Sequence, residues 1–382
     1  MNAINWELAT RIANKLTKPG PQFSKREMAV GVAELRAAAS EAIDLVVNTS
    51  GLPNDGRAAV YVVDRPTIIT VNIANSAYLF QASGTDKLLP DETAADNLFG
   101  VVLGTVMSYL AHGVLGQFVP FQHSALYLVA PNIMGMERRL NVDPHDFRLW
   151  VCLHEQTHQA QFAAAPWMAE RLLQLIAQVT LAEKDTQQLA DTLLRTGEKI
   201  LKAGRKELRD TGIVNLIRQA APAEMSAALD AVTAQMSLLE GHADVIMDEV
   251  GPGVIKSLAD IRAKFDNRRA ERTKGIKSLP AKLTGMDAKM AQYADGAQFC
   301  RGVIRETDMD TLNLAFAAPE NLPSVPELAD PASWIARVTG TRQQPSNAPA
   351  PSHSPARRAA PVSETTERTS ASSQSAIEPK VG

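Results

Sequence analysis

Two histidines four residues apart, His154 and His158, belong to the string HEQTH in the middle of a segment that predicts one helix. The helix should begin at Asp143-Pro144, because aspartate caps free N–H groups and proline at the first helical position gives up no needed donor. It should end near Ala165, just before a proline. Residues four apart stand one above the other on a helix, so both imidazoles can reach one point in space. The fold must therefore place this helix so that the two rings share a site.

The string matches H-E-x-x-H, in which the two histidines bind one zinc ion. Zinc lowers the pKa of a bound water, and a neighbouring carboxylate can take its proton during attack on a carbonyl carbon. We therefore predict His154 and His158 as zinc ligands and Glu155 as the general base. The competing interpretation is a pair of core histidines satisfied by ordinary hydrogen bonds, since the line through Trp150, both histidines and Phe162 is otherwise apolar.

A catalytic zinc usually has three protein ligands, so a further donor is expected elsewhere in the chain. Residues 229–247 predict a helix with a stripe that is apolar except for Glu240. An unpaired carboxylate there would be costly to bury, and a metal ion removes that cost. Asp244, one turn later, could accept a hydrogen bond from the free ring N–H of a ligand histidine. Glu240 is the predicted third ligand, while His242 or Asp244 as ligand, with Glu240 paired to an arginine, stays open.

Several further stretches resemble one known family. They are NWELATRIANKL near the start, HEQTHQAQF, LLEGHADVIMD, QYADGAQFCRGVIRE and NLPSVPELADPASWIARV. Together they resemble the actinobacterial zincin-like metallopeptidase family, whose members are often labelled as associated with deazaflavin coenzyme biosynthesis. The resemblance covers nearly all of residues 1–340. It implies a zincin-like fold with His154, His158 and Glu240 at metal positions and Glu155 as general base.

The order of the motifs is also similar to the thermolysin-like clan, where a glutamate followed four residues later by an aspartate supplies the third ligand. Here the gap from His158 to Glu240 is much longer than in thermolysin. In zincins a strand edge beside the active-site helix commonly holds an extended peptide, and residues 125–130 are the strand expected in that role. Zincins often add a side chain that steadies an oxyanion, and the candidates are His242, Tyr293 and Tyr127.

The predicted fold is mainly α with a small β-sheet, an α+β zincin-like fold with the HExxH string on its active-site helix. Besides the HEQTH helix, helices are expected at residues 6–18, 25–47, 167–183, 185–203 and 223–250, the last of which carries Glu240. Short extended segments are expected at 60–63, 67–71 and 125–130. No charged side chain occurs between Asp96 and Glu137, and residues 98–121 could cross a bilayer by length. Polar residues, glycines and the lack of a flanking Lys/Arg cluster favour a buried core helix instead.

A formal net charge of -3 indicates no global attraction to nucleic acid or to anionic lipid. Cys152 and Cys300 stand in helical patterns and read as small buried side chains, which suits a reducing compartment. The start of the sequence lacks a basic segment followed by an apolar run, so no signal peptide is expected. The expected location is cytoplasmic, without insertion into a membrane. The sequence indicates no oligomeric state.

The composition changes after Gly340, where proline, serine and alanine dominate and large apolar side chains are almost absent. Residues 1–340 are therefore expected to form one zincin-like domain and residues 341–382 a disordered tail. The leading functional prediction is a zinc-dependent hydrolase, a metallopeptidase in which a Glu155-activated, zinc-bound water attacks a peptide or small amide substrate. Two alternatives stay open: a zinc-binding protein of the same fold with a non-catalytic role, and a hydrolase of a non-peptide amide.

Overall fold

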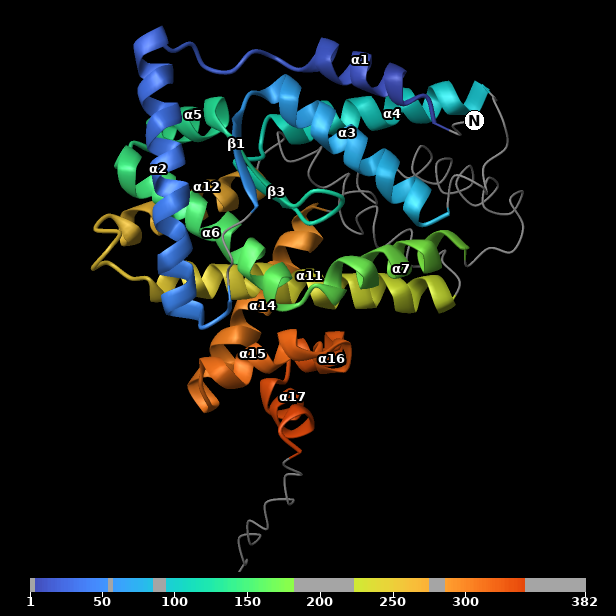
Figure 1. Cartoon of the computed structure of the whole chain (residues 1–382), viewed down its shortest axis with the longest axis vertical. Coiled ribbons are helices and arrows are strands. Elements are labelled where there is room, and N and C mark those ends of the chain that lie inside the picture. The colour runs from blue at the N-terminus through green and yellow to red at the C-terminus, as the bar shows by residue number, and fades with distance from the viewer. Residues whose placement is uncertain (1–3, 54–57, 85–93, 182–222, 275–285, 341–382) are drawn as a thin grey trace, which may run out of the picture. The chain divides into compact units, whose positions relative to one another are not determined.

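A computed structural model describes residues 4–53, 58–84, 94–181, 223–274 and 286–340 (Figure 1). The predicted tail at 341–382 and the predicted helix at 185–203 lie outside these residues. The chain is mainly helical with one small sheet, which confirms the α+β prediction. The elements are α1 (Trp6–Leu16), α2 (Lys25–Ser50), β1 (Ala59–Val63), α3 (Arg65–Ala82), α4 (Ala94–Ala111), β2 (Gly116–Val119), β3 (Ala125–Val129), α5 (Ala130–Leu140), α6 (Pro144–Ala164), α7 (Trp167–Leu181), α11 (Ala223–Glu249), α12 (Leu258–Lys274), α14 (Met286–Glu306), α15 (Met309–Ala317), a 3-10 turn (Pro319–Asn321), α16 (Val325–Leu328) and α17 (Pro331–Val338).

Five predicted helices are confirmed as α1, α2, α6, α7 and α11, with ends that differ by a few residues. Of the extended segments, the one at 60–63 is confirmed as β1, but the one at 67–71 is wrong, because it lies in α3. Asp64 caps that helix by accepting a hydrogen bond from the Thr67 N–H at 2.9 Å, and Pro66 stands in its first turn. The cap and the proline outweigh the strand preference of the β-branched residues that follow.

The uncharged run between Asp96 and Glu137 does not form one long helix. Helix α4 ends at Ala111, and the four-residue strand β2 begins at Gly116. The predicted core helix over residues 98–121 is therefore wrong beyond Ala111, and strand β2 was not predicted. In the part of the chain that the structure describes, no helix combines the length and the apolar character needed to span a membrane.

The sheet has the strand order β1, β3, β2. β1 runs parallel to β3, while β2 runs antiparallel to it, with Gly116 opposite Leu128. β3 is therefore the central strand, and the prediction that residues 125–130 form the open edge beside the active-site helix is wrong. Among the described strands, the outer one next to α6 is β2. Leu126 and Leu128 of β3 are fully buried in the same core as the α6 side chains.

Helix α6 carries the HEQTH string through the protein core. Asp143 caps it by accepting a hydrogen bond from the Asp146 N–H at 3.0 Å, and Pro144 is its first residue, as predicted. Its back packs against α2, where the fully buried Gln156 amide donates to the Ala39 carbonyl at 2.9 Å. The helix is thus held at its start and along its back, which leaves the two histidines on the opposite side.

Removal of the α6 cap is expected to destabilise the protein modestly. Asp143→Ala leaves the Asp146 N–H without its side-chain acceptor and should lower the free energy of unfolding by about 1 kcal/mol. Asp143→Asn keeps an acceptor in the same place and should stay within about 0.5 kcal/mol of the wild type. Urea unfolding of the three proteins measures both differences. Equal losses in the two variants would contradict this account, because they would point to the charge of Asp143 rather than to its cap.

Helices α11 and α14 cross with their backbones in direct contact. A Cβ atom on Gly241 would lie far inside contact distance of the Gly296 carbonyl group, and one on Gly296 would collide with the Ser237 carbonyl group. α11 also packs against α6 and α7, and Figure 1 shows α7 running alongside α11. The glycine pair therefore fixes the position of α11 at the residue next to Glu240.

Candidate metal centre

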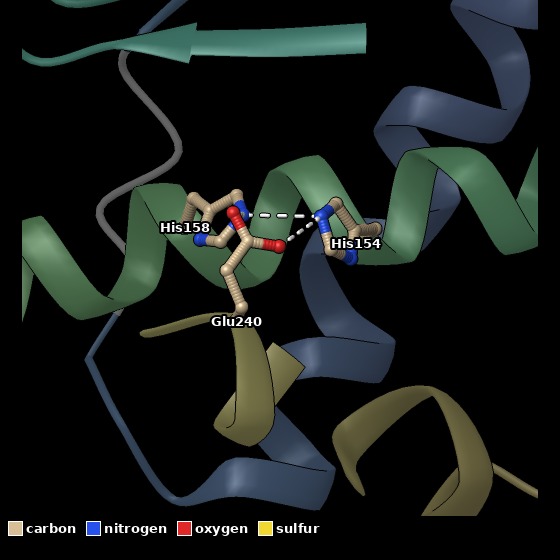
Figure 2. Close-up of side chains that lie close together, drawn as sticks. All are labelled: His154, His158 and Glu240. Carbon is tan, nitrogen blue, oxygen red and sulfur yellow. Dashed lines mark hydrogen bonds and ion pairs between the residues drawn. The ribbon is translucent and has the colours of Figure 1, made fainter. Parts of the chain in front are cut away.

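Three side chains from two helices converge on one point (Figure 2). The Nε2 atoms of His154 and His158, on α6, are 3.1 Å apart. The carboxylate of Glu240, on α11, lies 3.4 Å from His154 Nε2 and 3.9 Å from His158 Nε2. Ligand atoms that stand 2.0–2.1 Å from a tetrahedral zinc ion are about 3.3 Å from one another. The donor set and its spacing therefore fit zinc, as the sequence predicts for these residues.

The three side chains also differ from an ordinary buried cluster. The side chains are partly exposed to solvent, His154 by 28%, His158 by 13% and Glu240 by 23%, so an ion in solution can reach them. Burial, together with the charge of the His154 ring, lowers the pKa of His158. This shift favours the neutral ring of His158, which is the form that binds metals. These features favour a metal site over two histidines that are satisfied within a closed core.

Glu155 lies beside this group, between α6 and strand β2. Its side chain is almost fully buried, and its carboxylate accepts a hydrogen bond from the Phe118 N–H. A Cβ atom on Gly116 would lie 2.5 Å from Glu155 Cγ, so only a glycine lets the strand come this close. Burial raises the pKa of Glu155 to about 7, and the nearby Glu240 acts in the same direction against the charge of His154. The carboxyl group is therefore poised to exchange a proton near neutrality.

Gln161 is a site residue that sequence reasoning missed. Its side chain is fully buried between α6 and α11. Its Oε1 atom lies 2.9 Å from His158 Nδ1, and its amide nitrogen donates to the Leu239 carbonyl at 2.8 Å. The same nitrogen lies 3.1 Å from His242 Nδ1. The available signal was its place three residues after His158 on the same helix, but its partners on α11 are visible only in the fold.

Asp244 has partners other than the predicted one. Among the described residues, its carboxylate accepts hydrogen bonds from Arg262 and Arg301, and not from a ligand histidine. Burial alone would raise the pKa of Asp244, but the two arginines lower it. Helices α12 and α14 bring these arginines to the turn that carries Asp244, and the predicted role of Asp244 beside a ligand histidine stays a prediction. Of the residues that the structure describes, Glu240 and not Asp244 lies with the two histidines at the candidate metal site.

His242 lies away from the cavity, so its predicted roles as an alternative ligand and as an oxyanion or substrate contact are wrong. Residues two apart on a helix point about 200° from each other, and Glu240 faces the histidine pair. The His242 ring is fully buried and packs against the Phe316 ring in a T-shaped arrangement, with a centroid distance of 5.1 Å. Burial is the main cause that lowers the pKa of His242 to about 3.

Of the two tyrosines predicted as oxyanion contacts, the structure describes the side chain of only Tyr127. Tyr293 belongs to α14, but its side chain lies outside the described residues, so its predicted role stays untested. Tyr127 alternates along β3 with Leu126 and Leu128, which point into the core shared with α6. Its ring therefore faces the other side of the sheet, where it stacks on Tyr61 at 5.4 Å. Tyr127 is removed from the candidate site.

A cavity of about 570 Å³ opens beside the three converging side chains. Its apolar wall is formed by Trp150, Met247 and Phe265, and its other wall is charged. Arg262 lies over the Trp150 ring, with its guanidinium carbon 5.5 Å from the ring centroid. Arg262 and Arg301 are both paired with Asp248 as well as with Asp244. The cavity is large enough for several substrate atoms next to Glu155.

The family model for zincin-like metallopeptidases matches residues 4–335. A crystal structure from Chloroflexus aurantiacus, described as that of a suspected hydrolase with a novel fold, is similar with a TM-score of 0.64 and 26% identity, over 88% of this chain and 99% of that one. A search of curated proteins finds no match. The family match includes both helices that bring the candidate ligands together, and the chain belongs to the zincin-like metallopeptidase family.

Proposed function

We propose that this protein is a zinc-dependent metallopeptidase. The observation that carries the proposal is the convergence of His154, His158 and Glu240 on one point at a cavity, with the Glu155 carboxyl group beside them. Membership of the zincin-like metallopeptidase family supports a zinc hydrolase in general terms. The finer assignment, cleavage of peptide bonds, is supported by Glu155 and by the strand edge next to it.

His154 and His158 would hold the ion through Nε2, and Glu240 through its carboxylate. A zinc ion bound there supplies a Lewis acid, which polarises a carbonyl group and makes water a better nucleophile. The spacing of the three donors fits this ion. Zinc is therefore the cofactor we assign.

Glu155 is the general base in this proposal. Its carboxylate takes a proton from the attacking water and then gives the proton to the nitrogen of the leaving amine. In the metal-free protein, burial raises the pKa of this carboxyl group to about 7, and the positive charge of a bound zinc ion would act in the opposite direction. The hydrogen bond from the Phe118 N–H and the contact with Gly116 hold the carboxyl group in one position. A fixed base is one way in which an enzyme lowers the entropy cost of proton transfer.

The outer edge of β2 is suited to an extended peptide. The Val129 N–H donates to the Leu115 carbonyl at 2.8 Å, so alternate residues from Leu115 onward direct their backbone groups to β3. The backbone groups of Gly116 and Phe118 then point to the outer side, toward Glu155. Glu155 already accepts the Phe118 N–H, so a peptide that added a strand there would pair with the remaining outward groups of Gly116 and Phe118 and would pass close to the general base.

Loss of one ligand is expected to lower zinc affinity strongly. Glu240→Ala removes the charged donor from the three and should weaken zinc binding by about 100-fold or more, because the two histidines alone do not complete a site. Glu249→Ala removes an exposed carboxylate from the end of the same helix and serves as the control. Competition with a chromophoric chelator measures both affinities. Equal affinities for the two variants would remove Glu240 from the ligand set.

A mixed peptide library separates the peptidase from its alternatives. The zinc-loaded protein is expected to cleave library members, and the cleavage sites report whether it acts within chains or at their ends. Full zinc occupancy without cleavage would favour the non-catalytic binding role or a non-peptide amide as substrate. The actinobacterial and deazaflavin associations, the cytoplasmic location and the absence of a nucleic-acid partner stay predictions from the sequence.

A further inference from the structure

We propose that Gln161 is a positioning residue that sets the tautomer of His158 and joins the two helices that carry the metal ligands. This inference rests on the proposed metal site and deepens it. The side chain of Gln161 is fully buried between α6 and α11, and each of its polar atoms has a partner. The partners on α11 are Leu239, the residue before Glu240, and His242, two residues after it. One amide group therefore spans both sides of the candidate site.

The orientation of the amide follows from the Leu239 carbonyl group. A carbonyl oxygen can only accept, so the atom of Gln161 that lies 2.8 Å from it must be the NH₂ nitrogen. The reversed orientation would place two oxygens at hydrogen-bond distance without a hydrogen atom between them. Oε1 of Gln161 must then be the atom that faces His158 Nδ1 at 2.9 Å. The backbone of α11 thus selects one of the two orientations of the amide.

The fixed amide in turn fixes the imidazole of His158. An amide oxygen accepts a hydrogen bond, so Nδ1 must carry the proton. In the neutral ring, Nε2 then has a free lone pair, and this is the atom that lies 3.1 Å from His154 Nε2 and 3.9 Å from Glu240. That is the tautomer a metal ion requires at Nε2. Without Gln161, both tautomers become accessible and part of the population presents a proton to the metal.

His242 contacts the Gln161 amide from α11. Its Nδ1 atom is placed to accept the second N–H of the Gln161 amide, so both hydrogens of the NH₂ group have acceptors on α11. Its Nε2 atom is buried without a hydrogen-bond partner among the described residues. Burial of an unsatisfied ring nitrogen costs stability. A phenylalanine would avoid this cost, so packing against Phe316 does not by itself explain a histidine here, whereas the acceptor for Gln161 does.

The test compares two buried glutamines of α6. Gln161→Met removes the amide that contacts His158, whereas Gln156→Met removes an amide that is equally buried but donates to Ala39 on α2. Both variants should lower the Tm of the metal-free protein by similar amounts. Zinc affinity should fall about 10- to 100-fold in Gln161→Met and stay near the wild-type value in Gln156→Met. Equal zinc affinity in the two variants would overturn the inference.

A spectroscopic measurement tests the tautomer directly and does not need zinc. Long-range ¹H–¹⁵N spectra of the metal-free protein, assigned with His158→Ala, should show His158 protonated at Nδ1 in the wild type and a mixture of tautomers in Gln161→Met. An unchanged tautomer in the variant would overturn the role of Gln161. If the wild type shows the Nδ1–H tautomer but binds no zinc, the proposed function fails while the role of Gln161 in setting the ring survives.

His242→Phe separates positioning from stability. The substitution exchanges one unsatisfied buried N–H, on the ring, for another, on the Gln161 amide, so the Tm should change little. Zinc affinity should nevertheless fall several-fold, because the amide loses one of the two acceptors that orient it. A fall in Tm with unchanged zinc affinity would show that His242 serves packing alone and would contradict its place in this arrangement.

Discussion

Glu155→Gln is expected to lower the rate of peptide hydrolysis by about 10²- to 10⁴-fold while zinc affinity stays near the wild-type value. The amide has nearly the shape of the carboxylate, so it fits against Gly116 and can still accept the hydrogen bond from the Phe118 N–H. It cannot take a proton from water at any accessible pH. The loss should therefore appear in kcat rather than in binding of the metal or the peptide.

The measurement is cleavage of the most active library peptide by both proteins, with zinc determined on the same samples. The metal content is the internal control, since it separates a lost base from a lost ion. Wild-type turnover in Glu155→Gln would assign the base to another group. Lost turnover accompanied by lost zinc would instead place Glu155 among the residues that hold the ion.

Gly296→Ala is expected to have the largest effect on stability. The new methyl group would occupy the space of the Ser237 carbonyl. This is a backbone group of a helix, so the clash cannot be relieved by a change of rotamer. Helices α11 and α14 would have to move apart, at a cost of about 3 kcal/mol or more. The same movement would draw α11 away from α6 near Glu240, so zinc affinity should fall together with stability.

Gly253→Ala is the matched control for this substitution. A Cβ atom at Gly253 would meet nothing within 4 Å, so the free energy of unfolding should stay within about 0.5 kcal/mol of the wild type. Urea unfolding and chelator competition on the three proteins measure both effects. A Gly296→Ala protein as stable as the Gly253→Ala protein would show that the crossing can widen without loss.

The parts of the site that could be predicted from the sequence are those set by one helix. His154, Glu155 and His158 follow from a local spacing, and the start of their helix follows from the Asp143-Pro144 pair. Glu240 required one further argument, the cost of a lone carboxylate on an apolar stripe. These inferences need no knowledge of how the helices pack.

The parts that could not be predicted depend on neighbours from distant segments. Asp244 was placed by spacing beside a histidine, but α12 and α14 supply arginines at that turn. Gln161 looks like any polar residue until α11 provides acceptors for it. Strand β2 is only four residues long and stands in an uncharged run, where periodicity does not separate a short strand from a buried helix. The central place of β3 depends on that missed strand.

The shortness of β2 also bears on aggregation. An open strand edge that can receive a substrate can equally receive a strand from another copy of the chain, and long flat edges are common starting points for intermolecular sheets. β2 has four residues, and Pro120 follows it directly, so the chain offers no further N–H there to extend a ladder. A peptide of a few residues can pair along this edge beside Glu155. A strand from another copy of the chain would gain too few hydrogen bonds there to extend an intermolecular sheet.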